Sequence, residues 1–317
     1  MNIEAMKNQT FGVEIEMYMC RLIAAQVAAD FFGTSYIYVG GEYEEYKVPD
    51  RKGRYWSFKM DQSIEATEKY QTELVTPILF YDDIELLQRL VRRLRTFGAK
   101  SNPSRCCGVH VHVGADGHTA QSLMNLSNAM AGHEDLLIRA LDLDEDRLDE
   151  YCAKTTKLFL WGISGKRDIT MKEFREIWYR SHGSYDEESR QHHYNNSRYH
   201  MLNLHSVFYR GTIEFRLFQF DEPDNDDNSG IHAGQLKAYI QFCLAFSQYA
   251  KECKYCKVDI KCNRKFERTL HGSDHDLTTM RNWLNLLGLT GKEFETCRYF
   301  FTKRFTKKVH TYLEATA

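Results

Sequence analysis

Three short segments, far apart in the chain, constrain the fold most, because each alternates apolar and ionisable residues. The segments are TFGVEIEMYM (10–19), CCGVHVHVG (106–114) and TIEFRLF (212–218). Alternation with a period of two is typical of a strand that buries one face. Each polar face carries two ionisable side chains: Glu14 and Glu16, His110 and His112, Glu214 and Arg216. Because glutamate is depleted in strands and like charges on one face repel, the face with Glu14 and Glu16 needs either water or a bound cation.

The three polar faces can converge if the strands share one sheet, since neighbouring strands lie about 4.8 Å apart. Carboxylates at such density need positive charge nearby. Oxygen ligands with an occasional imidazole suit Mg²⁺ or Mn²⁺. Each pair alone is more typical of a solvated strand, a structural histidine pair or a weak ion pair. Their coincidence on three strands favours a metal site.

The rest of the chain predicts an α+β fold with a mainly antiparallel sheet, because strand patterns come early and helical patterns are interspersed or late. Hairpins are expected around 35–66, and TELVTPIL (72–79) reads as a further strand. We expect a sheet-bearing core over 10–220 with helical segments at 83–97 and 119–180, followed by a mainly helical region at 232–317. Phe97 completes the apolar stripe of the first helical segment, 119–152 reads as two helices, Thr170 and Glu173 have capping-box spacing, and 182–196 is expected as a loop. No linker interrupts the sequence, which predicts a single catalytic domain over 1–317.

Composition limits the possible partners and compartments. A net charge of −2 argues against nucleic acid as the main partner. The segment RLIAAQVAADFF is too short to span a bilayer, so we expect no membrane association. The first thirty residues show no secretory pattern, and the nine cysteines have no framework spacing. These features predict a cytoplasmic protein with reduced thiols.

Six motifs in this order resemble those of the amidoligase family, which belongs to the superfamily of glutamine synthetase and glutamate–cysteine ligase. They are GVEIE, MDQSIE, TELVTPIL, GVHVHVG, RYHMLNLHS and TIEFRLF, and the resemblance covers about residues 10–245. It implies a glutamine synthetase-like fold, in which a curved antiparallel sheet forms an open half-barrel with the active site on its concave face. It also implies an ATP-dependent carboxylate–amine ligase, which makes an acyl phosphate and then an amide.

The resemblance also implies roles for individual residues. The metal ligands, for Mg²⁺ or Mn²⁺, would be Glu14, Glu16, Glu73, His110 and Glu214. Catalytic roles would fall to Arg216, Arg198 and Asp61, and ATP would be bound by Arg216, His112, Asn203 and Ser63. Where the family usually reads Asp-Gly-Ser, this chain has Gln62 in place of the glycine, which leaves the geometry of that turn open. The substrates would be a carboxylate and an amine, each a small molecule or part of a peptide or protein.

Other functions are compatible with parts of the pattern. A zinc hydrolase would use His110 and His112, and a guanidino-kinase-like phosphotransferase would use the same sheet and ATP. A non-catalytic interaction protein would lack some of the charged residues, and none is missing here. The chain has neither a P-loop nor a Gly-rich dinucleotide motif. A zinc site formed by Cys253, Cys256 and Cys262 with His271 or His275 would rest on one CxxC motif, which is a weak signal.

Overall fold

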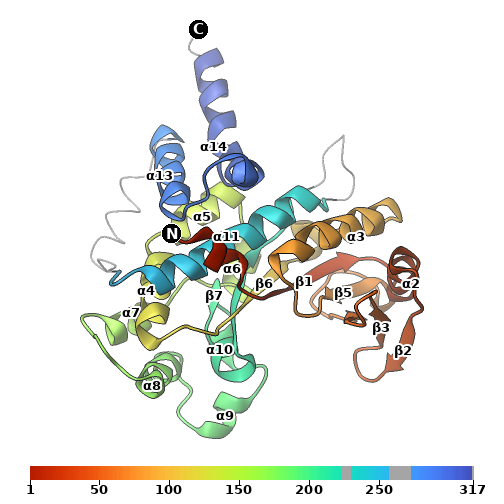
Figure 1. Ribbon diagram of the computed structural model, residues 1–317, viewed down its shortest axis with the longest axis horizontal. Helices are drawn as coiled ribbons and strands as arrows, with labels where there is room; N and C mark the ends of the chain where they lie inside the picture. Colours follow the sequence, from red (N-terminus) through yellow and green to blue (C-terminus); the bar gives the residue numbers. More distant parts are fainter. Residues whose placement is uncertain (223–229, 257–272, 316–317) are drawn as a thin grey trace. The chain divides into compact units, whose positions relative to one another are not determined.

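A computed structural model describes residues 1–222, 230–256 and 273–315 (Figure 1). The strands are β1 (Phe11–Tyr18), β2 (Ile37–Gly40), β3 (Glu45–Pro49), β4 (Tyr55–Lys59), β5 (Gln71–Val75), β6 (Val109–Gly114), β7 (Leu202–Asn203) and β8 (Thr212–Phe218). They form one open antiparallel sheet in the order β2-β3-β4-β5-β1-β6-β8-β7. The predicted α+β class and antiparallel sheet are confirmed, and the glutamine synthetase-like half-barrel stays a prediction.

Along the chain, the helices precede, separate and follow these strands. They are α1 (Ile3–Lys7), α2 (Arg21–Phe32), α3 (Ile84–Thr96), α4 (Ala120–Ala131), α5 (Glu134–Leu141), α6 (Glu145–Glu150), α7 (Lys157–Ile163), α8 (Met171–Ser181), α9 (Glu187–Gln191), α10 (His205–Arg210), α11 (Ala233–Glu252), α13 (Ser273–Leu286) and α14 (Glu295–Ala315). The predicted helical regions are present. The described part of 232–317 is mainly helical, and the segment 182–196, expected as a loop, contains the short helix α9.

Contacts divide the chain into two compact units. Unit 1 comprises residues 1–7, 113–216 and 241–317, and unit 2 comprises residues 8–112 and 217–240. The boundary falls inside β6 and inside β8, so each of these strands contributes residues to both units. The expectation of a single catalytic domain stays a prediction.

Unit 2 is built on strands β1 to β5, which bury one face against helices. Trp56 and Phe58 on β4 are fully buried, and α2 packs on β3, β4 and α3. The ring centroids of Phe32 on α2 and Trp56 lie 5.3 Å apart. Since side chains alternate along a strand, Ser57 and Lys59 of β4 point to the opposite face of the sheet.

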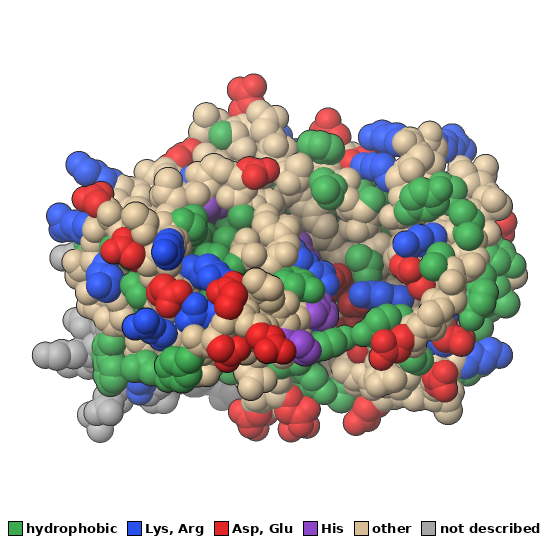
Figure 2. Space-filling model, turned by 90° about the horizontal axis from the view of Figure 1, so that it is seen from below, with side chains coloured by type: hydrophobic (Ala, Val, Ile, Leu, Met, Phe, Trp, Pro, Cys, Tyr) green, Lys and Arg blue, Asp and Glu red, His purple; other side chains and the backbone are tan. Residues whose placement is uncertain are grey.

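The edge of unit 2 carries apolar side chains that remain exposed. Tyr36, Ile37, Tyr38 and Val39, in and next to β2, are 39–54% exposed. Figure 2 shows hydrophobic side chains interspersed with charged ones on the face that it draws. Edge strands of this kind offer unpaired backbone groups.

Unit 1 is mainly helical. Helix α14 packs on α13 and α5, and Arg139 of α5 forms a two-fold hydrogen-bonded ion pair with Asp276 of α13. Helix α8 begins at a capping box, in which Thr170 accepts a hydrogen bond from the Glu173 N–H and the Glu173 carboxylate accepts one from the Thr170 N–H.

Candidate active site and metal centre

Three buried glutamates lie on neighbouring strands of unit 2. Strand β1 carries Glu14 and Glu16, which are 8% and 4% exposed, and β5 carries Glu73, which is 4% exposed. The antiparallel register places Glu73 directly opposite Glu16. The apolar residues of β1 at Val13, Ile15 and Met17 are buried as the alternation predicts. The second face of β1 is therefore not a solvated surface but an acidic site.

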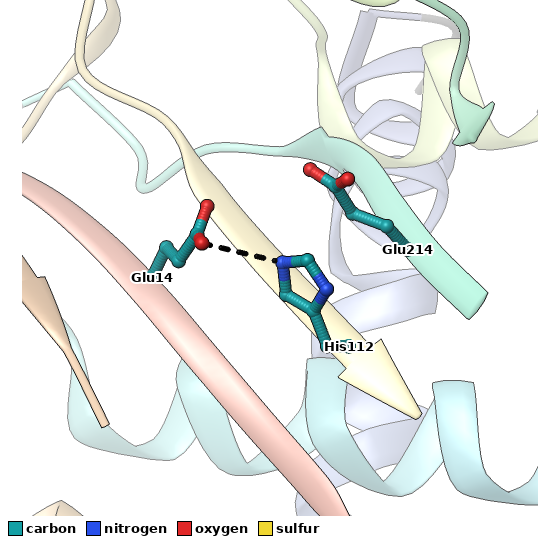
Figure 3. A group of neighbouring side chains, drawn as sticks. All are labelled: Glu14, His112 and Glu214. Atoms are coloured by element: carbon teal, nitrogen blue, oxygen red, sulfur yellow. Dashed lines mark ion pairs between the residues drawn. The ribbon is translucent and has the colours of Figure 1, made fainter. Parts of the chain in front are cut away.

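Imidazoles from β6 lie against these carboxylates. His110 Nδ1 is 3.2 Å from Glu14 Oε2, and His110 Nε2 is 3.5 Å from Glu16 Oε1. His112 Nε2 is 3.5 Å from Glu14 Oε1, the ion pair that Figure 3 draws. The Gly108 N–H donates a hydrogen bond of 2.5 Å to Glu16 Oε2. Figure 3 also labels Glu214, which β8 carries in unit 1.

The charges in this site are unevenly balanced. Burial alone would raise the pKa of Glu14, but the imidazoles of His112 and His110 hold that pKa well below its usual range. Burial and the nearby Glu14 carboxylate raise the pKa of Glu73 to about 8. The ammonium of Lys59, 2.7 Å from Glu73 Oε2, offsets this only in part. At Glu73 the effects of burial and of the neighbouring carboxylate therefore outweigh the pairing with Lys59.

The donor atoms have the chemistry and spacing of a divalent-cation site. Ligand atoms of Glu14, Glu73 and His110 lie within 4.8 Å of one another, and so do those of Glu16, Asp61 and Glu73. Both groups are oxygen-rich, and the first includes one imidazole nitrogen. This set fits a hard divalent ion such as Mg²⁺ or Mn²⁺.

Asp61 and Ser63 lie in a tight turn next to this cluster. Asp61 Oδ1 accepts hydrogen bonds from the Ser63 N–H at 2.9 Å and from Ser63 Oγ at 2.7 Å. Gln62 is not among the residues with positive φ. The turn therefore forms without the conformational freedom of the glycine that the family usually has at this position.

A second cluster lies within unit 1, around the buried carboxylate of Glu214. Arg216 Nη1 donates to Glu214 Oε1 at 2.5 Å, and Asn203 Nδ2 donates to Glu214 Oε2 at 2.6 Å. The pairing of β7 with β8 brings Asn203 opposite Glu214. Arg216 also donates from Nε to the Tyr151 carbonyl at 3.3 Å. Glu214 thus fixes both a guanidinium and an amide in unit 1.

Arg198 lies among aromatic rings in the same unit. Its guanidinium is 5.3 Å from the ring centroid of Tyr194 and 5.7 Å from that of Tyr199. Its Nη1 also donates to the His193 carbonyl at 3.4 Å. Among the described residues Arg198 has no carboxylate partner, so its charge is available for an anion. Arg216 lies 5.9 Å from the same Tyr199 ring.

Sequence reasoning missed two residues of these clusters. Lys59 pairs with Glu73 because the β4–β5 register sets them opposite each other. Tyr199 lies between the two arginines as a shared aromatic contact. The alternation of Ser57 and Lys59 within YWSFK was the available signal for Lys59. Nothing in the sequence indicated which strand would lie beside it.

The cysteine-based zinc site stays untested. Cys253 and Cys256 are half-buried, and Asn125 bonds to the backbone of both. Cys262 and His271 lie outside the described residues, as does most of the acidic segment 221–230.

None of the helices in the described parts of the chain has the length and apolarity to cross a bilayer.

The chain is similar to a known protein family. A family model with the description "putative amidoligase enzyme" matches residues 7–247. The match covers β1 to β8 and most of α11, and thus both clusters. A search of curated proteins found no match.

Proposed function

The chain belongs to the amidoligase family, and on this premise we propose that it is an ATP-dependent ligase that joins a carboxylate to an amine. In this reaction the substrate carboxylate attacks the γ-phosphorus of ATP, which releases ADP and gives an acyl phosphate. The amine then attacks the acyl carbon, loses a proton and releases inorganic phosphate. The product is an amide, and the substrates are small molecules or peptides.

We assign cation-binding roles to Glu14, Glu16, Glu73 and His110 in unit 2 and to Glu214 in unit 1. Bound divalent ions would neutralise the triphosphate oxygens and the charge that develops on the transferred phosphoryl group. The residues of the chain hold this arrangement in place. The Gly108 N–H orients Glu16, and His110 bridges Glu14 and Glu16 through its two ring nitrogens.

The basic residues act on the anionic groups of the substrates. We assign Arg216 to the transferring phosphoryl group, because Glu214 and the Tyr151 carbonyl hold its buried guanidinium in a fixed orientation. Arg198 binds a substrate or phosphate oxygen, and His112, Asn203 and Ser63 contribute to ATP binding. Asp61 lies close to Glu16 and Glu73, with ligand atoms within 4.8 Å of theirs. We assign its carboxylate a catalytic role, either as a proton acceptor or as a further cation ligand.

One observation carries the proposal: the carboxylates of Glu14, Glu16 and Glu73 are buried together beside the imidazoles of His110 and His112 in unit 2. Burying carboxylates close together costs stability, and burial and the Glu14 carboxylate raise the pKa of Glu73. Groups of buried titratable residues that cost stability are often functional sites. The oxygen-rich ligand atoms of this group fit the binding of a divalent cation. The family assignment connects that cation to ATP-dependent amide formation.

The test is a screen for ADP release with Mg²⁺, in which amino acids, amines and peptides are offered in pairs. Mass spectrometry of active mixtures should detect a product equal to the two substrates minus water. Glu16→Gln and Arg216→Ala should each abolish ADP formation, because one removes a cation ligand and the other removes the phosphoryl contact. Circular dichroism and thermal melting would check that both variants fold.

Matched controls are Glu42→Gln on the exposed hairpin loop and Arg92→Ala on the exposed side of α3, which should retain activity. Turnover in both Glu16→Gln and Arg216→Ala would remove these residues from the mechanism. Hydrolysis with zinc and without nucleotide would indicate the hydrolase alternative. A stable phosphorylated product without an amide would indicate the phosphotransferase alternative.

A further inference from the structure

A pocket of about 240 Å³ lies in unit 2, where the C-terminal end of α2, the β3–β4 turn and α3 meet. Its apolar walls are Phe31, Phe32 and Leu86. Its polar rim carries Arg51, Lys52, Arg54 and Arg89, together with Asp50. The pocket thus combines an aromatic floor with an excess of positive charge.

This pocket is separate from the acidic cluster of unit 2, which consists of Glu14, Glu16 and Glu73. Phe32 contacts Trp56 of β4, and Trp56 points to the helix-covered face of the sheet. Lys59 of the same strand contacts Glu73 on the opposite face. Because positions 56 and 59 differ by an odd number, the two side chains project from opposite faces of β4. The sheet itself separates the two sites.

Part of the positive charge on the rim is already neutralised. Arg54 donates to Asp83 Oδ2 at 2.7 Å and to Asp50 Oδ2 at 2.8 Å. Lys52 Nζ lies 3.1 Å from Asp83 Oδ1. The charges of Arg54 and Lys52 are therefore balanced by those of Asp50 and Asp83, and these ion pairs form one side of the pocket.

Arg51 and Arg89 are different, because neither has a carboxylate partner within residues 1–222, 230–256 and 273–315. Arg51 donates from Nε to the Phe32 carbonyl at 3.1 Å, which fixes its guanidinium at the pocket. The guanidinium of Arg89 lies 5.6 Å from the ring centroid of Phe31. Two exposed guanidinium groups therefore border the pocket, one held by a backbone hydrogen bond and one lying near the Phe31 ring, and both have hydrogen-bond donors for a ligand.

We propose that this pocket binds a small organic anion, whose carboxylate or phosphate lies at Arg51 and Arg89 and whose apolar body rests on Phe31. Guanidinium groups pair with both kinds of oxyanion, and aromatic rings favour an apolar or aromatic body. The volume suits such a ligand. It exceeds the ~150 Å³ of a cavity that holds benzene and falls below the ~300 Å³ lower limit for drug-sized ligands.

Isothermal titration calorimetry on the full chain can test the site with four probes: phenyl phosphate, phenylacetate, inorganic phosphate and benzyl alcohol. We expect one of the two aryl anions, or both, to bind at one site more tightly than either inorganic phosphate or benzyl alcohol. Arg51→Ala and Arg89→Ala should each weaken that binding by about three- to fivefold, and the double variant should weaken it further. Arg92→Ala, one turn along α3, is the matched control and should bind like the wild type.

The two aryl probes distinguish the sources of the anion, since tighter phenyl phosphate binding indicates a phosphate ligand and tighter phenylacetate binding a carboxylate ligand. Phe31→Ala should weaken the aryl anions and leave inorganic phosphate unchanged. No binding by the wild type, or equal binding by the wild type and the Arg51→Ala/Arg89→Ala double variant, would overturn the proposal. The readout is binding alone, so it does not depend on ligase activity.

Discussion

At the scale of single residues, Asp50 illustrates how one buried carboxylate organises a turn. Oδ1 accepts from the N–H groups of Lys52 and Arg54, at 2.8 and 3.0 Å. Oδ2 accepts from Arg54 Nε and from Trp56 Nε1. Although burial would raise the pKa of Asp50, these hydrogen bonds lower it. The carboxylate thus joins the β3–β4 turn to the core tryptophan.

We expect Asp50→Asn to lower the free energy of unfolding by about 2 kcal/mol, because an amide cannot accept at both oxygens and leaves Arg54 less well paired. Urea denaturation followed by tryptophan fluorescence would measure the loss. Glu42→Gln is the control and should change stability by less than about 0.5 kcal/mol. Equal stability of Asp50→Asn and the wild type would contradict this role.

Residues of the candidate site could be predicted from the sequence only where a local pattern, such as strand alternation, indicated them. Glu14, Glu16 and His110 follow from alternation within one strand, which fixes the face of each side chain. Lys59 could not be found in this way, because its contact with Glu73 depends on the register between two strands. Register is set by packing and turn geometry over long distances and leaves no local signal.

At the scale of elements, α8 shows a helix whose start was readable from the sequence. The Thr170–Glu173 capping box forms as its spacing predicts. Thr170→Ala should lower the free energy of unfolding by about 1 kcal/mol, because two N–H groups of the first turn lose their acceptor or its orientation. Thermal and urea melts of the variant would measure this effect.

Thr67→Ala is a matched control for the capping prediction. Thr67 precedes a short 3-10 helix and makes no side-chain capping hydrogen bond. Its replacement should leave stability nearly unchanged. If both threonine variants lose the same stability, the loss does not come from capping.

Other elements differed from the expected pattern for local reasons. The region 119–152 was expected to hold two helices and contains three, because Asp142 adopts a left-handed conformation that ends α5 and Asp144 caps α6. Phe97 was placed on the buried stripe of α3 but is 48% exposed, since it follows the helix and lies beneath Arg93. Helix ends depend on single backbone conformations that periodicity does not encode.

At the scale of the whole molecule, buried neutral histidines make stability depend on pH. Burial and the neighbouring His200 lower the pKa of His182 to about 4, and burial also lowers the pKa of His200. In the unfolded chain histidine titrates near pH 6.5. Between pH 6.5 and 4 the unfolded state therefore binds more protons than the folded state.

We expect the free energy of unfolding to fall as the pH drops through this range, by up to about 1.4 kcal/mol per pH unit from His182, and the lowered pKa of His200 acts in the same direction. Urea melts at pH 7, 6 and 5 would measure the slope. His182→Gln should make the slope shallower, whereas His192→Gln, which changes an exposed histidine, should not. A slope unchanged by His182→Gln would show that other groups cause the acid sensitivity.

Cation binding should also raise the stability of the whole molecule. Mg²⁺ or Mn²⁺ at 100 times its dissociation constant would stabilise the folded state by about 2.7 kcal/mol. We expect a higher melting temperature with either ion, and a return to the starting value with EDTA. Glu73→Gln should reduce this shift, and Glu42→Gln should keep it. An equal shift in both variants would place the cation elsewhere.

The chain passes between the two units at four peptide bonds, after residues 7, 112, 216 and 240. Neither unit is a continuous piece of sequence, so no single truncation or gene fusion isolates one of them. A recombination event with one crossover cannot exchange one whole unit without also exchanging part of the other or leaving part of the unit behind. Any chimera intended to carry unit 2 intact must transplant residues 8–112 and 217–240 together, and must splice twice within strands.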